Sequence, residues 1–212
     1  MAGSIHAKKG RSYERSLALA YDHRKCHNIG MRLALKLHPD SRCEAVTHID
    51  VDVARLRPGN LLLHYFVTGK LSDLVLPPVA APARGDELWL HTCFEAFVRL
   101  VPGEAYVEFN FASSRQWAAY RFNFYRSERL VASEIGAPRI DVRSNGTSAE
   151  LQASLELDRL LPSDAAWRLG LSAVIEETSG RKSYWALAHP PGKPDFHHSD
   201  CFALELPAVV RP

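Results

Sequence analysis

Residue types able to bind a polar ligand are concentrated between Asp86 and Phe124. From Leu88 to Leu100, apolar residues alternate with a second series that includes Trp89, His91 and Glu95. A period of two is typical of a β-strand that buries one face. Indole rings stack on flat apolar surfaces, and carboxylates accept hydrogen bonds from hydroxyl groups. We therefore expect the second series to bind a flat, polar molecule such as a sugar.

The following segment extends this polar surface. Residues 101–104 (VPGE) have the composition of a tight turn, so residues 106–111 should return antiparallel to the first strand. The register that closes this turn sets Glu95 opposite Asn110 and places Glu108 on the same face. The alternative interpretation is that Trp89 is a core or edge residue and that Glu95 is solvated.

Catalysis has less support than binding. Glu95 and Glu108 would share a face and could act as a carboxylate pair, but cross-strand carboxylates on an exposed sheet are more often solvated. The chain has no G-x-S-x-G motif, phosphate-binding loop or dinucleotide fingerprint. We expect a domain that binds its ligand without transforming it.

A second candidate site is the segment YWALAHPPGKPDFHH, residues 184–198. Its prolines make it stiff, and a stiff polar loop between strands suits ligand contacts. The alternative is a turn whose histidines cap backbone groups. As ligand-binding residues of this loop we predict His189, Lys193, Asp195 and His197.

Metal or haem binding is an alternative use of the histidines. The spacing of His189, His197, His198 and Cys201 matches no recognised zinc motif. Methionine–histidine ligation of haem is disfavoured because the only methionines, Met1 and Met31, lie outside the expected core strands. A bis-histidine site from His64, His91 or His189 stays open. We predict no cofactor, with haem or a metal ion as the alternative.

Charge and composition narrow the partners and the setting. The chain of 212 residues has a formal net charge of +2, which favours neither nucleic acid nor a membrane surface. No apolar run is long enough to span a membrane, and the N-terminus does not resemble a secretion signal. Four scattered cysteines fit a reduced, cytoplasmic protein.

The N-terminal residues differ from the rest of the chain. Residues 1–30 carry six basic and two acidic residues and lack apolar periodicity. We expect them to be a flexible basic leader, with Met31 as an alternative start and a transit peptide as a weaker option. Residues 31–212 are expected to form one domain.

Beyond Met31 the chain predicts one short strand after another. Two helical turns are expected, at residues 114–119 and 158–161. Asn145-Gly146 should form a two-residue hairpin turn with positive φ, which sets Ile140 and Val142 opposite Leu151 and Ala149. About ten strands with few helices indicate an all-β fold, a two-sheet antiparallel β-sandwich. Besides the opening hairpin, the expected strands are 33–37, 48–53, 60–68, 139–143, 147–157, 169–175, 183–188 and 201–206.

Three motifs carry a family resemblance: Asp86-Glu87-Leu88-Trp89, Cys93-Phe94-Glu95-Ala96-Phe97 and Tyr106-Val107-Glu108-Phe109-Asn110. Together they resemble the DOMON-like, family-9 carbohydrate-binding-module superfamily over roughly residues 31–208. The chain is similar in particular to the subgroup found alone or attached to a peptidoglycan-precursor reductase. It departs from the family in having Thr92-Cys93 where an acidic pair is usual. The resemblance implies a two-sheet antiparallel sandwich.

The resemblance also implies roles for particular residues. In sugar-binding members two tryptophans sandwich the sugar, while a glutamate, an arginine and amides bond its hydroxyls. Trp89 resembles the first tryptophan and Glu95 the glutamate. Arg115 is the nearest candidate for the arginine, and Trp185, with Trp117 behind it, for the second tryptophan. Two rival hypotheses stay open: a haem or metal enzyme, and a module whose polar face binds another protein.

Overall fold

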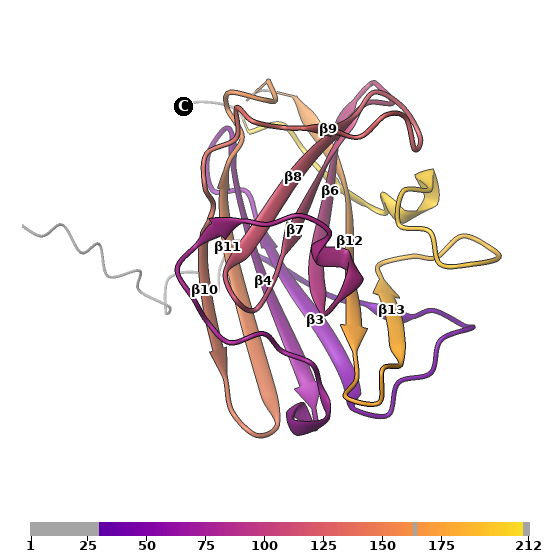
Figure 1. Cartoon of the computed structure of the whole chain (residues 1–212). Helices are drawn as coiled ribbons and strands as arrows, with labels where there is room; N and C mark the ends of the chain where they lie inside the picture. Colours follow the sequence, from indigo (N-terminus) through magenta and orange to yellow (C-terminus); the bar gives the residue numbers. More distant parts are fainter. Residues whose placement is uncertain (1–29, 163–164, 210–212) are drawn as a thin grey trace, which may run out of the picture.

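The protein is a β-sandwich, seen here in a computed structural model that describes residues 30–162 and 165–209 (Figure 1). The leader predicted for residues 1–30 falls, apart from Gly30, outside the described residues. Two antiparallel sheets stack face to face, as the alternating strands predicted. The prediction of an all-β sandwich is therefore confirmed. No helix in the described part of the chain is long and apolar enough to cross a membrane.

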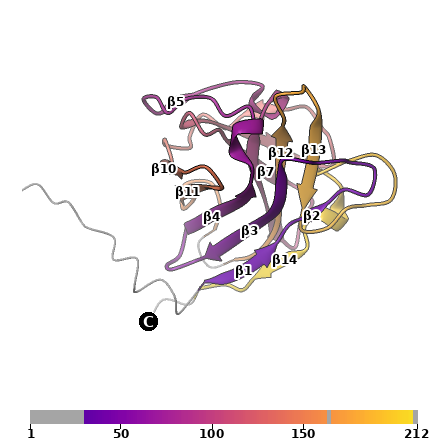
Figure 2. The same ribbon diagram turned by 90° about the horizontal axis from the view of Figure 1, so that it is seen from below.

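The first sheet has five strands in the order β1-β3-β4-β11-β10. It lies at the left of Figure 1, and its strands are seen from below in Figure 2. Their bounds are β1 Met31–Ala34, β3 Val46–Ala54, β4 Asn60–Gly69, β10 Arg139–Ser144 and β11 Ser148–Glu156.

The second sheet, nine-stranded in the described residues, has the path β2-β13-β12-β6-β7-β8-β5, with β14 beside β12 and β9 beside β8. Its strands are β2 Lys36–Leu37, β5 Ala83–Arg84, β6 Cys93–Val101, β7 Tyr106–Phe111, β8 Gln116–Phe122, β9 Leu130–Val131, β12 Ala166–Glu176, β13 Lys182–Ala186 and β14 Leu204–Leu206. Three 3₁₀ turns complete the described elements: η2 Leu71–Asp73, η3 Leu88–Leu90 and η4 Ser199–Cys201.

The period of two in the central strands decides which side chains enter the core. Phe94, Ala96 and Val98 of β6 point into the sandwich with Phe109 and Phe111 of β7, all nearly inaccessible to solvent. The neighbouring residues of the same strands point to the outer face of the sheet. The predicted register is confirmed, since Glu95 pairs with Asn110 and Phe97 with Glu108.

The outer face of the nine-stranded sheet is covered as well, which the sequence did not predict. Residues 187–203 leave β13 and pass over this face, visible as the yellow segment at the right of Figure 1. They contribute Phe196 and Phe202 to a second apolar cluster. Its buried members are Phe97, Tyr106, Ala118, Tyr120, Phe122, Val174, Ala186, Phe196 and Phe202.

Four local predictions were wrong. The strand expected from Leu88 starts only at Cys93, because residues 88–90 form the 3₁₀ turn η3. The helical turn expected at 114–119 is strand β8, whose pairing with β7 outweighs local preference. The strand expected from Cys201 begins at Leu204, after η4.

The fourth error concerns the hairpin turn at Asn145-Gly146. Val142 pairs with Leu151 and Ile140 with Ala153, a shift of two residues from the predicted register. Gly146 lacks the positive φ expected of it. The Asn145 side chain forms the turn instead, because its Oδ1 accepts hydrogen bonds from the backbone N–H groups of Thr147 and Ser148.

Candidate ligand-binding pocket

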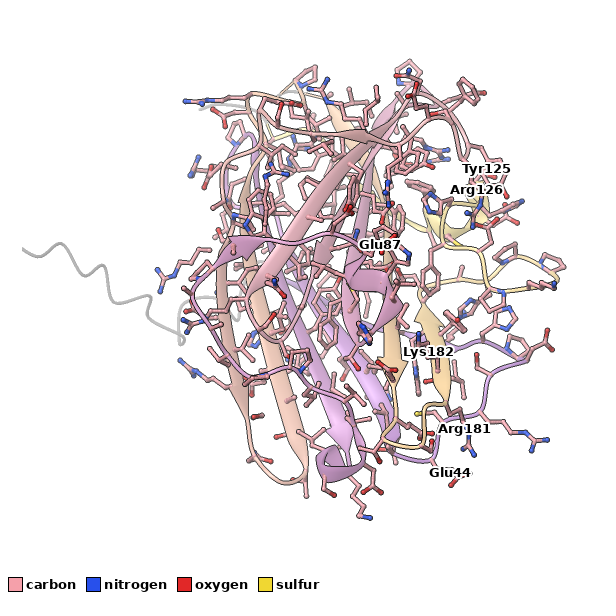
Figure 3. The ribbon with its side chains drawn as sticks, viewed as in Figure 1. Glu44, Glu87, Tyr125, Arg126, Arg181 and Lys182 are labelled. Atoms are coloured by element: carbon pink, nitrogen blue, oxygen red, sulfur yellow. The ribbon has the colours of Figure 1, made fainter. Side chains whose placement is uncertain are left out.

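A pocket of about 430 Å³ opens on the outer face of the nine-stranded sheet. A volume of this size fits one small-molecule ligand. Figure 3 shows Lys182 and Arg126 on this side of the molecule, away from the five-stranded sheet. The lining combines aromatic rings, two glutamates and several cationic side chains: Trp89, Leu90, Glu95, Glu108, Phe122, Arg126, Arg129, Val174, Lys182, Tyr184, Pro194, Phe196 and His197.

Trp89 forms one wall of the pocket. It is the middle residue of η3. This turn begins directly after Glu87, whose backbone has a positive φ of 53°. The ring meets Tyr120 edge to face at a centroid distance of 5.9 Å. The Arg129 guanidinium lies 4.7 Å from the centroids of both rings. These contacts hold the indole in place while leaving it half-buried, so part of it can contact a ligand.

The floor of the pocket holds two buried carboxyl groups. Glu95 of β6 is 3% exposed and Glu108 of β7 is 5% exposed. Burial, and then the neighbouring Glu108, raises the pKa of Glu95 well above its ordinary value. Burial also raises the pKa of Glu108, although its hydrogen bond with Asn110 and the charges of Arg129 and Arg126 oppose this. The alternative interpretation, in which these carboxylates are solvated, is therefore wrong.

Uncharged groups position the two carboxyl groups. Asn110 Nδ2 donates to Glu108 Oε1 at 2.6 Å, and Ser172 Oγ donates to Glu95 Oε2 at 3.3 Å. From the other sheet, the Tyr65 hydroxyl donates to the backbone carbonyl of Glu95 at 2.7 Å. Each carboxyl group thus has one oxygen without a hydrogen bond from Asn110 or Ser172.

His197 lies beside this floor. Its Nδ1 is 2.8 Å from the Tyr106 hydroxyl, and its Nε2 is 3.8 Å from Glu108 Oε2. Burial, reinforced by the charge of Arg126 and opposed by that of Asp195, lowers the pKa of His197 to about 4. The imidazole is therefore neutral at physiological pH.

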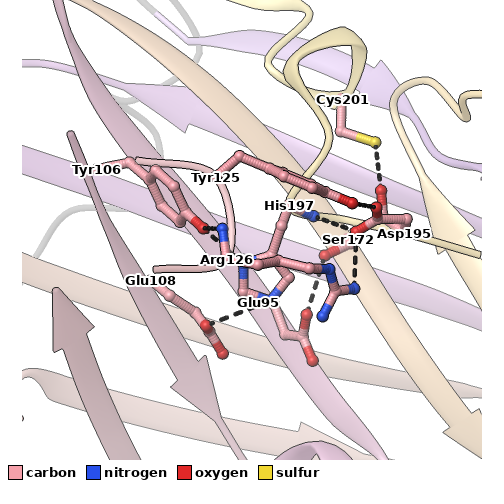
Figure 4. A network of polar contacts seen from close by, with 9 residues as sticks. All are labelled: Glu95, Tyr106, Glu108, Tyr125, Arg126, Ser172, Asp195, His197 and Cys201. Atoms are coloured by element: carbon pink, nitrogen blue, oxygen red, sulfur yellow. Dashed lines mark hydrogen bonds and ion pairs between the residues drawn. The ribbon is translucent and has the colours of Figure 1, made fainter. Parts of the chain in front are cut away.

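Asp195 joins the loop that carries His197 to the loop after β8. One of its oxygens accepts from the Arg126 guanidinium at 2.8 Å and from the His197 backbone N–H at 3.1 Å. The other accepts from the Tyr125 hydroxyl at 2.6 Å. Figure 4 shows this network beside the two glutamates. The network fixes His197 and Arg126 relative to each other.

The predicted site residues separate into three groups. Trp89, Glu95 and His197 line the pocket, while Asn110 and Asp195 support its lining. The other predicted residues lie elsewhere. Lys193 is exposed outside the lining, and His189 packs edge to face on His38 at 4.8 Å and contacts the Lys36 carbonyl at 2.8 Å.

The two residues carried over for the second tryptophan and the arginine are also outside the pocket. Trp185 is 5% exposed and points into the core, where its indole N–H donates to Ser183 Oγ. Its neighbour Tyr184 faces the pocket instead. Trp117 is likewise a core residue. Arg115 lies in the turn between β7 and β8 with a φ of 69°.

Several lining residues were missed. Arg126 and Arg129 belong to the loop after β8, whose sequence has neither the alternation of a strand nor a recognised motif. Lys182 and Tyr184 lie on the outer face of β13, and only the pairing of β13 with β12 shows which of its faces is the outer one. Because Trp185 pairs with Ala173, a core residue, its neighbours in β13 point outward.

The described part of the chain offers no cluster of side chains for the metal or haem alternatives. Within residues 30–162 and 165–209, no group of three or more His, Cys, Asp or Glu side chains could hold a metal ion. Of the histidines considered, His197 contacts Tyr106, His198 contacts Asp200, and His91 contacts Glu176 at 2.7 Å.

Comparison with known proteins adds information on the fold alone. The sequence matches no family model and no curated protein. A Bacteroides uniformis protein provisionally described as carbohydrate-binding is similar in structure, with a TM-score of 0.61 and 15% identity over 81% of this chain and 83% of that one. The two proteins share a fold.

Family 9 carbohydrate-binding modules from Caldicellulosiruptor kristjanssonii are more distantly similar. One, in complex with cellotriose, has a TM-score of 0.48 and 8% identity over 77% of this chain and 75% of that one. Another, in complex with glucose, has a TM-score of 0.41 and 13% identity over 74% and 76%.

Proposed function

We propose that the protein binds a sugar or a sugar-containing metabolite in the pocket on the outer face of the nine-stranded sheet. The observation that carries this proposal is the meeting of a half-exposed indole with two carboxyl groups and an imidazole in one hollow. Trp89 offers an apolar ring surface, and Glu95, Glu108 and His197 offer hydrogen-bonding groups that can match the hydroxyls of a pyranose.

The roles of the rim follow from its charges. Arg126 and Arg129 present guanidinium N–H groups, which donate to hydroxyl or ring oxygens. In this proposal Tyr184 replaces Trp185 as the second aromatic group of the pocket. The fold shared with a protein provisionally described as carbohydrate-binding supports the same ligand class.

The finer assignments are part of the proposal. We place the chain among DOMON-like and family-9-like domains, in the subgroup similar to those attached to peptidoglycan-precursor reductases, and in the cytoplasm. Support comes from the motifs around Trp89, Glu95 and Glu108, and from the two-sheet sandwich that the resemblance implies.

A calorimetric binding screen tests the proposal. The purified chain is titrated with mono- and disaccharides, amino sugars and nucleotide sugars. At least one should bind saturably, and Trp89→Ala should weaken that binding about fivefold or more, because stacking on an indole contributes about 1 kcal/mol or more. Trp185→Phe, a change in the core, is the matched control and should bind normally. A folded protein that binds none of these sugars would refute the proposal and favour a protein-binding face.

A further inference from the structure

The floor of the pocket contains more acid–base chemistry than sugar binding requires. A binding site can hold hydroxyls with amides or with ionised carboxylates paired to arginine. Here two neighbouring carboxyl groups are buried, and the side chains that donate hydrogen bonds to them are the uncharged Asn110 and Ser172. Burying such a pair lowers stability unless it retains a proton, and sites of this kind are concentrated where proton transfer occurs.

The second element is an imidazole within reach of one of these acids. His197 Nε2 lies 3.8 Å from Glu108 Oε2, and both side chains line the pocket. In a cyclic aldose, the hydroxyl oxygen O1 and the ring oxygen O5 are bonded to the same carbon, C1. O1 and O5 are closer together than His197 Nε2 and Glu108 Oε2 are. A sugar placed against the pair can therefore present O1 to His197 and O5 to Glu108 at the same time.

The surroundings set complementary proton states. Asn110 occupies Glu108 Oε1, which leaves Oε2 to carry the proton. The Tyr106 hydroxyl is 2.8 Å from His197 Nδ1 and can accept a hydrogen bond from Nδ1–H, which leaves the lone pair of Nε2 directed to the pocket. A neutral acid and a neutral base are then adjacent. Other ionisable groups around them are Glu95, Tyr106, Arg126, Arg129 and Asp195.

We propose that the protein interconverts the anomers of the aldose it binds, with Glu108 as general acid and His197 as general base. The inference rests on the proposed sugar binding and adds an activity to it. It goes beyond the expectation that the ligand is bound without being transformed.

The reaction balances without a cofactor. His197 Nε2 takes the proton of the O1 hydroxyl, and the electrons of that O–H bond form the C1=O1 double bond. The C1–O5 bond breaks, its electron pair goes to O5, and Glu108 protonates O5. The open-chain aldehyde now lies beside an imidazolium and a carboxylate, which stabilise each other as an ion pair.

Ring closure restores both groups. After rotation about C1–C2, O5 attacks the opposite face of C1 while the Glu108 carboxylate removes its proton. The imidazolium of His197 returns a proton to O1, which gives the other anomer. Acid and base end in the states in which they began.

Polarimetry provides the test. Freshly dissolved α-D-glucose, α-D-galactose and N-acetyl-α-D-glucosamine are followed with and without protein, and binding of the same sugars is measured by calorimetry. The relaxation rate should rise in proportion to protein concentration for the sugar that binds. Methyl α-D-glucoside has no O1 hydroxyl, so its rotation should not change.

Two variants connect the rate to the residues. Glu108→Gln and His197→Gln should lower the protein-dependent rate about 100-fold or more while sugar binding changes much less, since general acid–base catalysis contributes about 10²–10⁴-fold. Glu205→Gln and His48→Gln, exposed positions away from the pocket, are the matched controls and should keep the full rate.

A pH profile of the wild-type rate tests the roles of Glu108 and His197 even if both variants misfold. The rate should fall as pH decreases through about 4, where His197 becomes protonated, and fall again at higher pH, where Glu108 ionises. Binding with no acceleration overturns this inference and leaves the proposed function intact. Absence of both binding and acceleration overturns both.

Discussion

Replacing Glu95 by Gln tests whether the pocket floor holds a proton that the unfolded chain would lose. Glu95 is 3% exposed, and burial together with the adjacent Glu108 raises its pKa. A group whose pKa is raised by folding stabilises the protein fully below its unfolded pKa. That contribution is lost as pH rises through the folded pKa. The glutamine side chain has the same shape but no titration, so the variant lacks this loss.

The size of the expected change in the free energy of unfolding follows from the binding of one proton. While the folded state keeps a proton that the unfolded state has released, the free energy of unfolding falls by about 1.4 kcal/mol per pH unit. His197 opposes this, because its pKa of about 4 when folded makes stability rise with pH up to its unfolded value. The wild-type curve is therefore a sum of opposite slopes, and the difference between variant and wild type reports the titration of the Glu95–Glu108 pair.

Urea unfolding followed by tryptophan fluorescence at pH 4.5, 5.5, 6.5 and 7.5, steps of about one unit, measures that difference. The variant should gain stability relative to wild type as pH rises, by up to about 1.4 kcal/mol per unit. Glu205→Gln, at a side chain that is 58% exposed, is the control for replacing a glutamate by glutamine away from the pocket. If the Glu95→Gln difference is independent of pH, no proton is held at this position and the account of the floor is wrong.

Three further predictions concern the supports of the pocket. Tyr65→Phe removes the hydrogen bond to the Glu95 carbonyl and should cost about 1 kcal/mol, seen as a Tm lower by about 2–4 °C. An unchanged Tm would show that this bond adds no net stability. His197→Gln should lose the rise in stability between pH about 4 and about 6.5, so that urea midpoints of the variant fall relative to wild type across that window. Asp195→Asn releases Arg126 and should weaken sugar binding several-fold by calorimetry with a stability loss under about 1 kcal/mol; unchanged binding would argue against a role for Arg126.

Much of the hairpin that forms the floor could be predicted because its geometry is local. An antiparallel turn at residues 101–104 and a period of two leave one register in which both apolar sets face the same side. Glu95 and Asn110 therefore had to be neighbours, as the structure confirms. The sandwich followed from the same alternation repeated along the chain.

Trp185 shows where that reasoning stopped. Strand β13 has large side chains on both faces, so alternation alone did not say which face enters the core. Pairing with β12 decides it, since Trp185 lies opposite Ala173 and Tyr184 opposite Val174. This contact depends on a partner strand whose register the short segment itself does not encode.

By itself, the sequence determined that Glu95, Glu108 and Asn110 lie on one face of the hairpin formed by β6 and β7. Tertiary structure decided that the carboxyl groups are buried. That outcome depends on the segment after β13 packing Phe196 and Phe202 over the outer face, a contact between residues far apart in the chain. Local periodicity specifies a direction for each side chain, but only the elements packed against it determine whether the side chain meets water or a second apolar layer.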